Sequence, residues 1–194
     1  MNAALRAALL LNLVQVFTAL SFLTVPVLAP AIGADLGVPT TLLGAYSAIL
    51  WLGGLASSLA AGSIIGRLGA LRTSQACLVF CAAGLAAGAQ GSLAALAALP
   101  LLVGFGCGVE TPSSSQLLAR VTPPDQRPFI FSLKQTGVQL GGMLTGIVQP
   151  ALLPWLGWRG ALAGGAALAL AYAFALEPFR RTYDTPAAAP RTPH

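Results

Sequence analysis

Long apolar stretches separated by short polar breaks run through almost the whole chain. They cover about residues 7–32, 41–65, 73–89, 93–119, 128–153 and 158–176. An α-helix needs about 17 to 25 apolar residues to cross the hydrocarbon core of a bilayer, and every stretch is long enough. The pattern predicts an all-α integral membrane protein, with six transmembrane helices forming one bundle within residues 1–181.

Both ends of the chain need a separate interpretation. Arg6, the apolar stretch after it and Ala29-Pro30-Ala31 also fit a cleaved signal peptide. A signal peptide has an apolar core of only about 7–15 residues, whereas this stretch is longer and contains Asn12 and Gln15, so a spanning helix is favoured. The last segment, 182–194, is rich in Pro and Ala and has nothing to bury, which predicts a disordered tail.

Composition agrees with a membrane protein and excludes several other classes. The chain is 56% hydrophobic and only 8% charged, with a mean hydropathy of +0.80, whereas soluble domains carry about a quarter charged residues. The net charge of +5 does not indicate a nucleic-acid partner, because the basic residues are scattered singly between apolar runs. The lipid bilayer is the partner that the composition predicts.

The arginines predict the orientation of the six helices. Six spans place both termini on one side, and all arginines but Arg159 then fall on that side: Arg6, Arg67, Arg72, Arg120, Arg127, Arg180, Arg181 and Arg191. Cytoplasmic loops carry an excess of basic residues, so both termini are expected in the cytoplasm. The arginine-rich and alanine-rich usage is typical of a bacterial GC-rich genome, which would make the membrane the cell inner membrane.

Two ionisable residues lie deep inside apolar stretches. Glu110 lies about ten residues before Arg120, and Lys134 about seven after Arg127. At ~1.5 Å per residue they lie roughly 15 and 10 Å from the turn between the fourth and fifth helices, so they can meet. An ionisable group at such depth costs at least ~2.5 kcal/mol, which is why such residues are usually paired or face water.

Further polar residues are predicted at the same depth. Asn12 and Gln15 share one face of the first helix, and together with Glu110, Lys134 and Gln135 they form an expected polar layer, with Ser114 nearby. Two interpretations remain open: the layer binds a polar substrate or couples its movement to protons, or it holds helices together by hydrogen bonds and a structural ion pair. Lys134 is the only lysine, and burial can shift the pKa of a lysine or a carboxylate.

Other kinds of site find little support. Cys77, Cys81 and Cys107 all lie in apolar stretches and the only histidine is His194, so neither a metal site nor a disulfide framework is expected. No cofactor is predicted. An intramembrane hydrolase would need a second buried acid or a serine with a basic partner, so an enzyme is not expected.

A weak internal repeat supports a bundle made of two related units. Leu52-Gly53-Gly54 recurs as Leu140-Gly141-Gly142, 88 residues later, and Leu68-Gly69 recurs as Leu156-Gly157 at the same offset. The copies lie on helices that run in opposite directions, which predicts two inverted three-helix repeats. On the fifth helix the small residues form a stripe that predicts close helix packing: Gly137, Gly141, Gly142 and Gly146.

The loop after the second helix resembles that of a known family. In Gly62-Ser63-Ile64-Ile65-Gly66-Arg67-Leu68-Gly69-Ala70-Leu71-Arg72, the residues Gly62, Arg67 and Gly69 match the conserved loop of the major facilitator superfamily, Gly66 stands in place of its acid, and Arg72 is displaced. Other similar positions are Pro124-Asp125-Gln126-Arg127, Gly137, Gly141-Gly142 and Gly157-Trp158-Arg159. The chain is similar to the N-terminal six-helix half of such a transporter.

The resemblance implies a function and a larger assembly. Members of this family have twelve helices in two halves and move small solutes by alternating access, with the first and fourth helices lining the central cavity. The polar layer would then face this cavity, and the loop containing Gly62, Arg67, Gly69 and Arg72 would serve the inside gate. A lone half would expose its polar layer, so a homodimer, or a fragment completed by a separate second half, is expected. The alternative is a non-transporting fragment, or a pore or assembly subunit.

Overall fold

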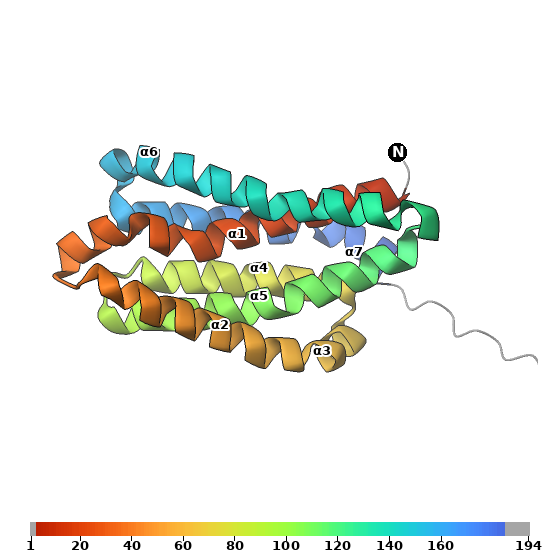
Figure 1. Cartoon of the computed structure of the whole chain (residues 1–194), viewed down its shortest axis with the longest axis horizontal. Helices are drawn as coiled ribbons and strands as arrows, with labels where there is room; N and C mark the ends of the chain where they lie inside the picture. The colour runs from red at the N-terminus through yellow and green to blue at the C-terminus, as the bar shows by residue number, and fades with distance from the viewer. Residues whose placement is uncertain (1–2, 185–194) are drawn as a thin grey trace, which may run out of the picture.

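The computed structural model describes residues 3–184, and every regular element in this range is helical. The predicted all-α class is confirmed. The helices run lengthwise beside one another in an elongated bundle (Figure 1). In chain order the elements are α1 (Ala3–Leu36), η1 (Thr40–Leu42), α2 (Leu43–Leu59), α3 (Ala61–Leu68), α4 (Ala70–Gly88), α5 (Leu93–Val121), η2 (Pro124–Gln126), α6 (Arg127–Ala175) and α7 (Glu177–Tyr183).

Four or five of these helical segments qualify as membrane spans, where the apolar stretches predict six. By length and composition, four segments can each cross a membrane: α1, Thr40–Leu59, α4 and α5. Helix α6 taken together with α7, which is bent from it by 45°, would be a fifth span. The expected fifth and sixth helices both lie within α6, which has 49 residues. Its helical geometry breaks at Gly157, with φ 62° and ψ 174°, a conformation open almost only to glycine. Figure 1 shows the chain turning back at this end of the bundle.

The expected second helix, 41–65, is also interrupted. It divides at Ala60 into α2 and α3. The amide of Ala60 donates to the carbonyl of Ser57, three residues back rather than four, and the hydroxyl of Ser63 donates to the Ala60 carbonyl at 2.8 Å. A serine hydroxyl that competes for a backbone carbonyl in this way weakens a helix locally.

The C-terminal tail does not begin where the composition suggested. Thr182 and Tyr183 belong to α7, and Tyr183 is buried against the N-terminal part of the bundle, where its hydroxyl donates to the carbonyl of Ala3. The Pro and Ala residues of segment 182–194 predict disorder from Thr182 onward. The aromatic ring of Tyr183 nevertheless packs into an apolar core of the bundle. Residues 185–194 lie outside the described range.

The contacts between helices place α1 at the centre of the bundle. It packs along α6 and also contacts α4 and α5, while α2 packs mainly on α5. Two apolar cores lie between the helices, one at each end. Members of the core at the end near α7 include Leu11, Leu71, Leu78, Leu118 and Leu176, and members of the other include Leu28, Leu85, Leu99, Trp158 and Leu162.

Glycine lets the backbones of α1 and α6 come into contact. A Cβ at Gly137 would collide with the carbonyl oxygen of Asn12, and one at Gly141 would lie 2.7 Å from the Cβ of Ala19. The packing stripe predicted for α6 extends no further, because a Cβ at Gly142 would be in ordinary contact and one at Gly146 would meet open space. Nine residues at about 100° each place Gly146 on the side of α6 opposite to Gly137, away from α1.

A pair of substitutions on α6 tests this packing. Gly137→Ala should lower the free energy of unfolding by about 1–3 kcal/mol, since overpacking forces the two backbones apart. The matched control, Gly146→Ala, should be neutral or slightly stabilising, because alanine favours the helix and the added methyl group has room. Thermal unfolding of the detergent-solubilised protein measures both. Equal losses in the two variants would contradict the close approach of α1 to α6.

Candidate functional site

Three helices bring their polar side chains together in the interior of the bundle. Lys134 on α6 lies 3.7 Å from Glu110 on α5, measured from Nζ to Oε2, and both side chains are only 3% exposed. From α1, Gln15 donates through Nε2 to the same carboxylate oxygen at 3.2 Å. The residue spacing thus predicted a real contact, and we call Asn12, Gln15, Glu110 and Lys134 the polar layer.

Asn12 attaches the polar layer to the backbone of α6. Its Nδ2 donates to the carbonyl of Leu133 at 2.8 Å, and the same amide lies 3.3 Å from the Lys134 carbonyl and 3.0 Å from Thr136 Oγ1. These contacts lie one turn from Gly137, where α1 and α6 touch. Asn12 therefore acts as a structural residue between helices rather than as a free polar group.

Two acceptors in the polar layer have no donor. Glu110 Oε1 and Gln15 Oε1 are both buried without a hydrogen-bond partner. A buried polar atom left unpaired usually costs about 1–3 kcal/mol, so natural proteins keep few of them. The layer can accept at least one further donor, such as a proton on the carboxylate or a hydroxyl group of a ligand.

The polar layer is enclosed within the single chain, which corrects one expectation. Asn12, Gln15, Glu110 and Lys134 are 8%, 3%, 2% and 2% exposed, so no second bundle is needed to cover them. The sequence alone could not show this, because the neighbouring backbone of α1 and the bulk of α5 and α6 provide the cover. Burial of these residues is therefore no argument for a dimer.

Two exposed threonines connect the polar layer with the surface. Thr111, next to Glu110, points its hydroxyl toward Oε2 of that carboxylate at 3.5 Å, and Thr136 accepts from Asn12. Both threonines are exposed. Thr136 was not among the predicted site residues, although its place two residues after Lys134 in an apolar stretch was a usable signal.

Two predicted site residues lie apart from the polar layer. Gln135 is exposed, one residue beyond Lys134 and rotated by about 100° around α6. Ser114 is buried, but its hydroxyl donates to the carbonyls of Glu110 and Thr111 in its own helix. These bonds occupy the turn around Pro112, so Ser114 supports the helix that carries Glu110.

Sequence reasoning missed a second polar contact between α1 and α6. Gln149, which is 2% exposed, donates through Nε2 to Thr24 Oγ1 at 3.0 Å, and its Oε1 has no partner. A glutamine inside an apolar stretch was the available signal. This contact lies about nine residues further along α1 than Gln15, or roughly 13 Å, so it forms a separate layer.

The end of the predicted gating loop is held by Asp184, the last residue that the structure describes. Asp184 accepts hydrogen bonds from the amides of Leu71 at 2.7 Å and Arg72 at 2.8 Å, and thereby caps the N-terminus of α4. A Cβ at Gly69, whose φ is 92°, would collide with this carboxylate. Gly62 and Arg67 are exposed on α3.

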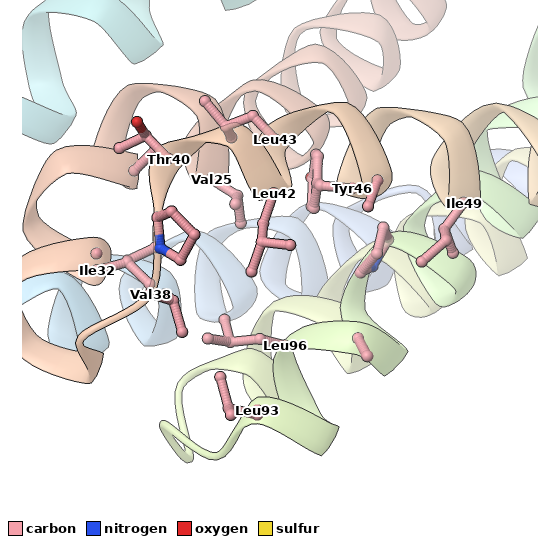
Figure 2. A pocket seen from close by; sticks show the side chains of 16 residues that line it. Val25, Ile32, Val38, Thr40, Leu42, Leu43, Tyr46, Ile49, Leu93 and Leu96 are labelled. Carbon is pink, nitrogen blue, oxygen red and sulfur yellow. The ribbon is translucent and has the colours of Figure 1, made fainter.

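A separate apolar cavity of about 340 Å³ lies between α1, α2 and the start of α5 (Figure 2). It is lined by aliphatic side chains such as Val25, Ile32 and Leu96, with Pro39 and Tyr46. The hydroxyl of Tyr46 is engaged with the carbonyl of Phe22. Ligand sites usually combine an apolar wall with a few convergent polar groups. The lining residues include none that is charged, so this cavity is not the place for an ionic substrate.

The described residues contain no group of three His, Cys, Asp or Glu side chains arranged to hold a metal ion. What they do contain is a buried ion pair between helices long and apolar enough for a bilayer. An ionisable residue at such a position typically marks the pathway of an ion or substrate. The fold and site define a polytopic membrane protein of the transporter class.

The comparison with protein families identifies the chain more closely. The sequence matches the profile of the Major Facilitator Superfamily over residues 11–193. The chain belongs to this family of membrane transporters, which are not enzymes, and the predicted resemblance is confirmed.

Several characterised transporters are similar to the chain. The 4-hydroxybenzoate transporter PcaK of Pseudomonas aeruginosa is 28% identical over 172 residues, which is 88% of this chain and 38% of that protein. The gallate transporter of Pseudomonas putida is 36% identical over 39% of this chain and 17% of its own length. The chain therefore spans less than half the length of the curated relatives it matches.

A double-mutant cycle tests the ion pair. Glu110→Gln and Lys134→Met should each lower the folded yield, because removing one member of a buried pair leaves an unbalanced charge that costs ~3–5 kcal/mol. The double substitution should restore most of the yield, since no charge remains. Monodisperse protein after detergent extraction is the measurement. Purely additive losses would show that the two side chains do not interact.

Proposed function

We propose that this chain forms one six-helix half of a secondary transporter that moves a small organic acid by alternating access. The observation that carries the proposal is the buried pair of Glu110 and Lys134. Two buried acceptor oxygens beside the pair have no donor, and two exposed threonines, Thr111 and Thr136, contact the polar layer. The named substrates of the relatives, 4-hydroxybenzoate and gallate, are both aromatic acids, which supports a carboxylate as the ligand of Lys134.

Charge balance suggests how substrate and protons are linked. The polar layer is neutral while Glu110 is ionised and Lys134 is protonated. The ion pair is long at 3.7 Å, so a substrate carboxylate can compete with Glu110 for the ammonium group. A net buried charge is costly in this surrounding, and neutrality returns when Glu110 takes up one proton. The buried Oε1 without a donor is a suitable place for that proton.

Two contacts related by the 88-residue offset support an arrangement of six spans in two inverted repeats. Gly53 on α2 packs against the backbone of Gly104 on α5, and Gly141 on α6 packs against the backbone of Val16 on α1. Gly141 lies 88 residues after Gly53, and Gly104 lies 88 residues after Val16. The two contacts therefore join equivalent positions of the two three-helix units, with each unit in the place of the other. Units related by a pseudo-twofold axis make contacts in such equivalent pairs.

The turn glycines support the same arrangement. Gly69 before α4 and Gly157 inside α6 are also 88 residues apart, and both have positive φ and extended ψ, at 92° and 158° and at 62° and 174°. In this proposal, residues 127–156 and 158–175 cross the bilayer separately, and the two turns lie at opposite membrane surfaces.

Exposed apolar faces support a second bundle beside this one. Helix α2 packs mainly on α5, and its outer face presents Trp51, Leu52, Leu55 and Leu59 with at least 58% exposure. The relatives are more than twice as long as the matched region. A separate second half or a second copy of the chain would cover part of this face, while lipid covers the rest.

Binding of 4-hydroxybenzoate as a function of pH tests the coupling. At neutral pH and above, affinity for the purified protein should fall as pH rises, because binding takes up a proton at Glu110. Glu110→Gln, which keeps the shape of a protonated acid, should remove this dependence, whereas Thr136→Val should keep it. Affinity independent of pH in the unmodified protein would contradict the proposal.

Flux measurements separate a carrier from the alternatives. In proteoliposomes, uptake of labelled 4-hydroxybenzoate that saturates and is inhibited by unlabelled substrate supports a carrier. Uptake that rises linearly without saturation supports a pore subunit, and absence of uptake with intact binding supports a part that needs another bundle.

We also propose that both termini are cytoplasmic. The ends of α3, α5 and α7 and the starts of α1, α4 and α6 carry seven of the eight arginines in the described part of the chain. Arg159 alone lies at the other end, where it pairs with Asp35 at 3.2 Å. A bias of this size favours the arginine-rich end as the inner one.

Thiol labelling tests this orientation. A cysteine at the exposed residue Ala34 should react with an impermeant maleimide added to intact cells, and one at Gly66, where a side chain has open space, should react only after the membrane is opened. The unsubstituted protein controls for its own cysteines. Labelling of Gly66→Cys from outside would reverse the topology.

A further inference from the structure

A groove of about 470 Å³ runs along the outside of the bundle between α4, the second part of α6 and α7. It is distinct from the polar layer, which lies between α1, α5 and the first part of α6. The residues that line it include Arg72, Val79, Phe80, Phe174 and Arg180. Large apolar side chains of the lining are open, with Phe174 71% exposed and Val79 46% exposed.

Both walls of the groove change character at the same end. Along α4 the lining begins with Arg72 and continues through Gln75 to Val79 and Phe80. The facing wall runs in the opposite chain direction, from Leu170 and Phe174 on α6 to Glu177 and Arg180 on α7. From Arg72 to Phe80 the groove covers about 12 Å along the helix axis. It is therefore basic at the end formed by Arg72 and Arg180 and apolar at the end formed by Phe80 and Leu170.

Hydrogen bonds fix the basic end in place. The amide of Arg72 is held by Asp184, and Gln75 donates through Nε2 to the carbonyl of Ala173 and to Glu177 Oε2, each at 3.0 Å. Glu177 also accepts from Arg180 at 2.7 Å. The hydrogen bonds of Asp184 and Gln75 thus hold α7 against α4 on both sides of the opening. The walls of the groove are therefore fixed relative to each other.

The charges at this end favour an anion. Arg72, Arg180 and the adjacent Arg181 line this groove and its neighbouring pocket together with one carboxylate, that of Glu177, and Asp184 adds a second at the amide of Arg72. Three arginines thus face two carboxylates. The guanidinium of Arg180 already binds Glu177, while the side chain of Arg72 is exposed. Arginine binds phosphate well because its planar donors match two oxygens at once.

We propose that this groove binds one phospholipid with an anionic headgroup. Its phosphate lies between Arg72 and Arg180, and one acyl chain follows Val79, Phe80 and Phe174 into the bilayer. Basic pockets between transmembrane helices suit anionic lipids because attraction to the headgroup adds to burial of the chain. The inference requires only that this end lies at a membrane surface. The proposed topology further assigns the lipid to the cytoplasmic leaflet.

Native mass spectrometry of the detergent-purified full chain tests the site, with phosphatidylglycerol and phosphatidylcholine of identical acyl chains as probes. The unmodified protein should retain phosphatidylglycerol preferentially. Arg72→Gln should reduce that preference about fivefold, as expected for one arginine at a lipid headgroup. Ala76→Trp leaves every charge in place but fills the groove, and should reduce binding of the same lipid.

Arg67→Gln is the matched control, because Arg67 is exposed at the same end but lies outside the groove. It should leave the preference unchanged. An equal loss in Arg67→Gln and Arg72→Gln would overturn the proposal in favour of diffuse attraction, and equal retention of both lipids by the unmodified protein would overturn it outright. Soluble glycerol 3-phosphate at the concentration of the lipid should not displace it, and displacement would show that the apolar wall has no part. None of these readouts depends on transport, so they stand apart from the proposed function.

Discussion

A charge buried between membrane helices has to be balanced within the protein, and this requirement organises the centre of the bundle. Glu110 and Lys134 come from different helices, and Gln15 reaches the carboxylate from a third. The backbones of α1 and α6 touch at Gly137, which brings Gln15 close to this pair. The hydrophobic effect, which drives the packing of cores in soluble proteins, is weak between helices in lipid. Small residues and polar contacts together therefore determine which helices meet. Packing and chemistry are therefore located at the same turn of α6.

The sequence was informative wherever one physical rule dominated. Apolar length and composition predicted the all-α class, and helix geometry predicted the depths at which Glu110 and Lys134 meet. The loop motif around Arg67 and Gly69 predicted the family. Each of these inferences uses spacing along the chain, which the sequence states directly.

Other features depend on neighbours that no spacing reveals. The cover over the polar layer is set by which helices lie alongside. Gly146 belongs to the same sequence stripe as Gly137, yet no neighbouring helix in the described part of the chain lies within contact of a side chain there. Tyr183 and Asp184 lie in a segment of disorder-prone composition, but their side chains find an apolar site and two free amides. Composition averages over such single contacts and so misses them.

The cap that Asp184 forms on α4 has a mechanical consequence. If α7 moved away from the bundle, the amides of Leu71 and Arg72 would lose their acceptors, and the turn at Gly69 would lose the carboxylate that packs against it. Tyr183 would at the same time release the first turn of α1. The last described residues thus act as a strut between the start of α1 and the start of α4. A pull on the chain beyond Asp184 would be transmitted to both helices at once, and through α1 to the helix that holds the buried carboxylate.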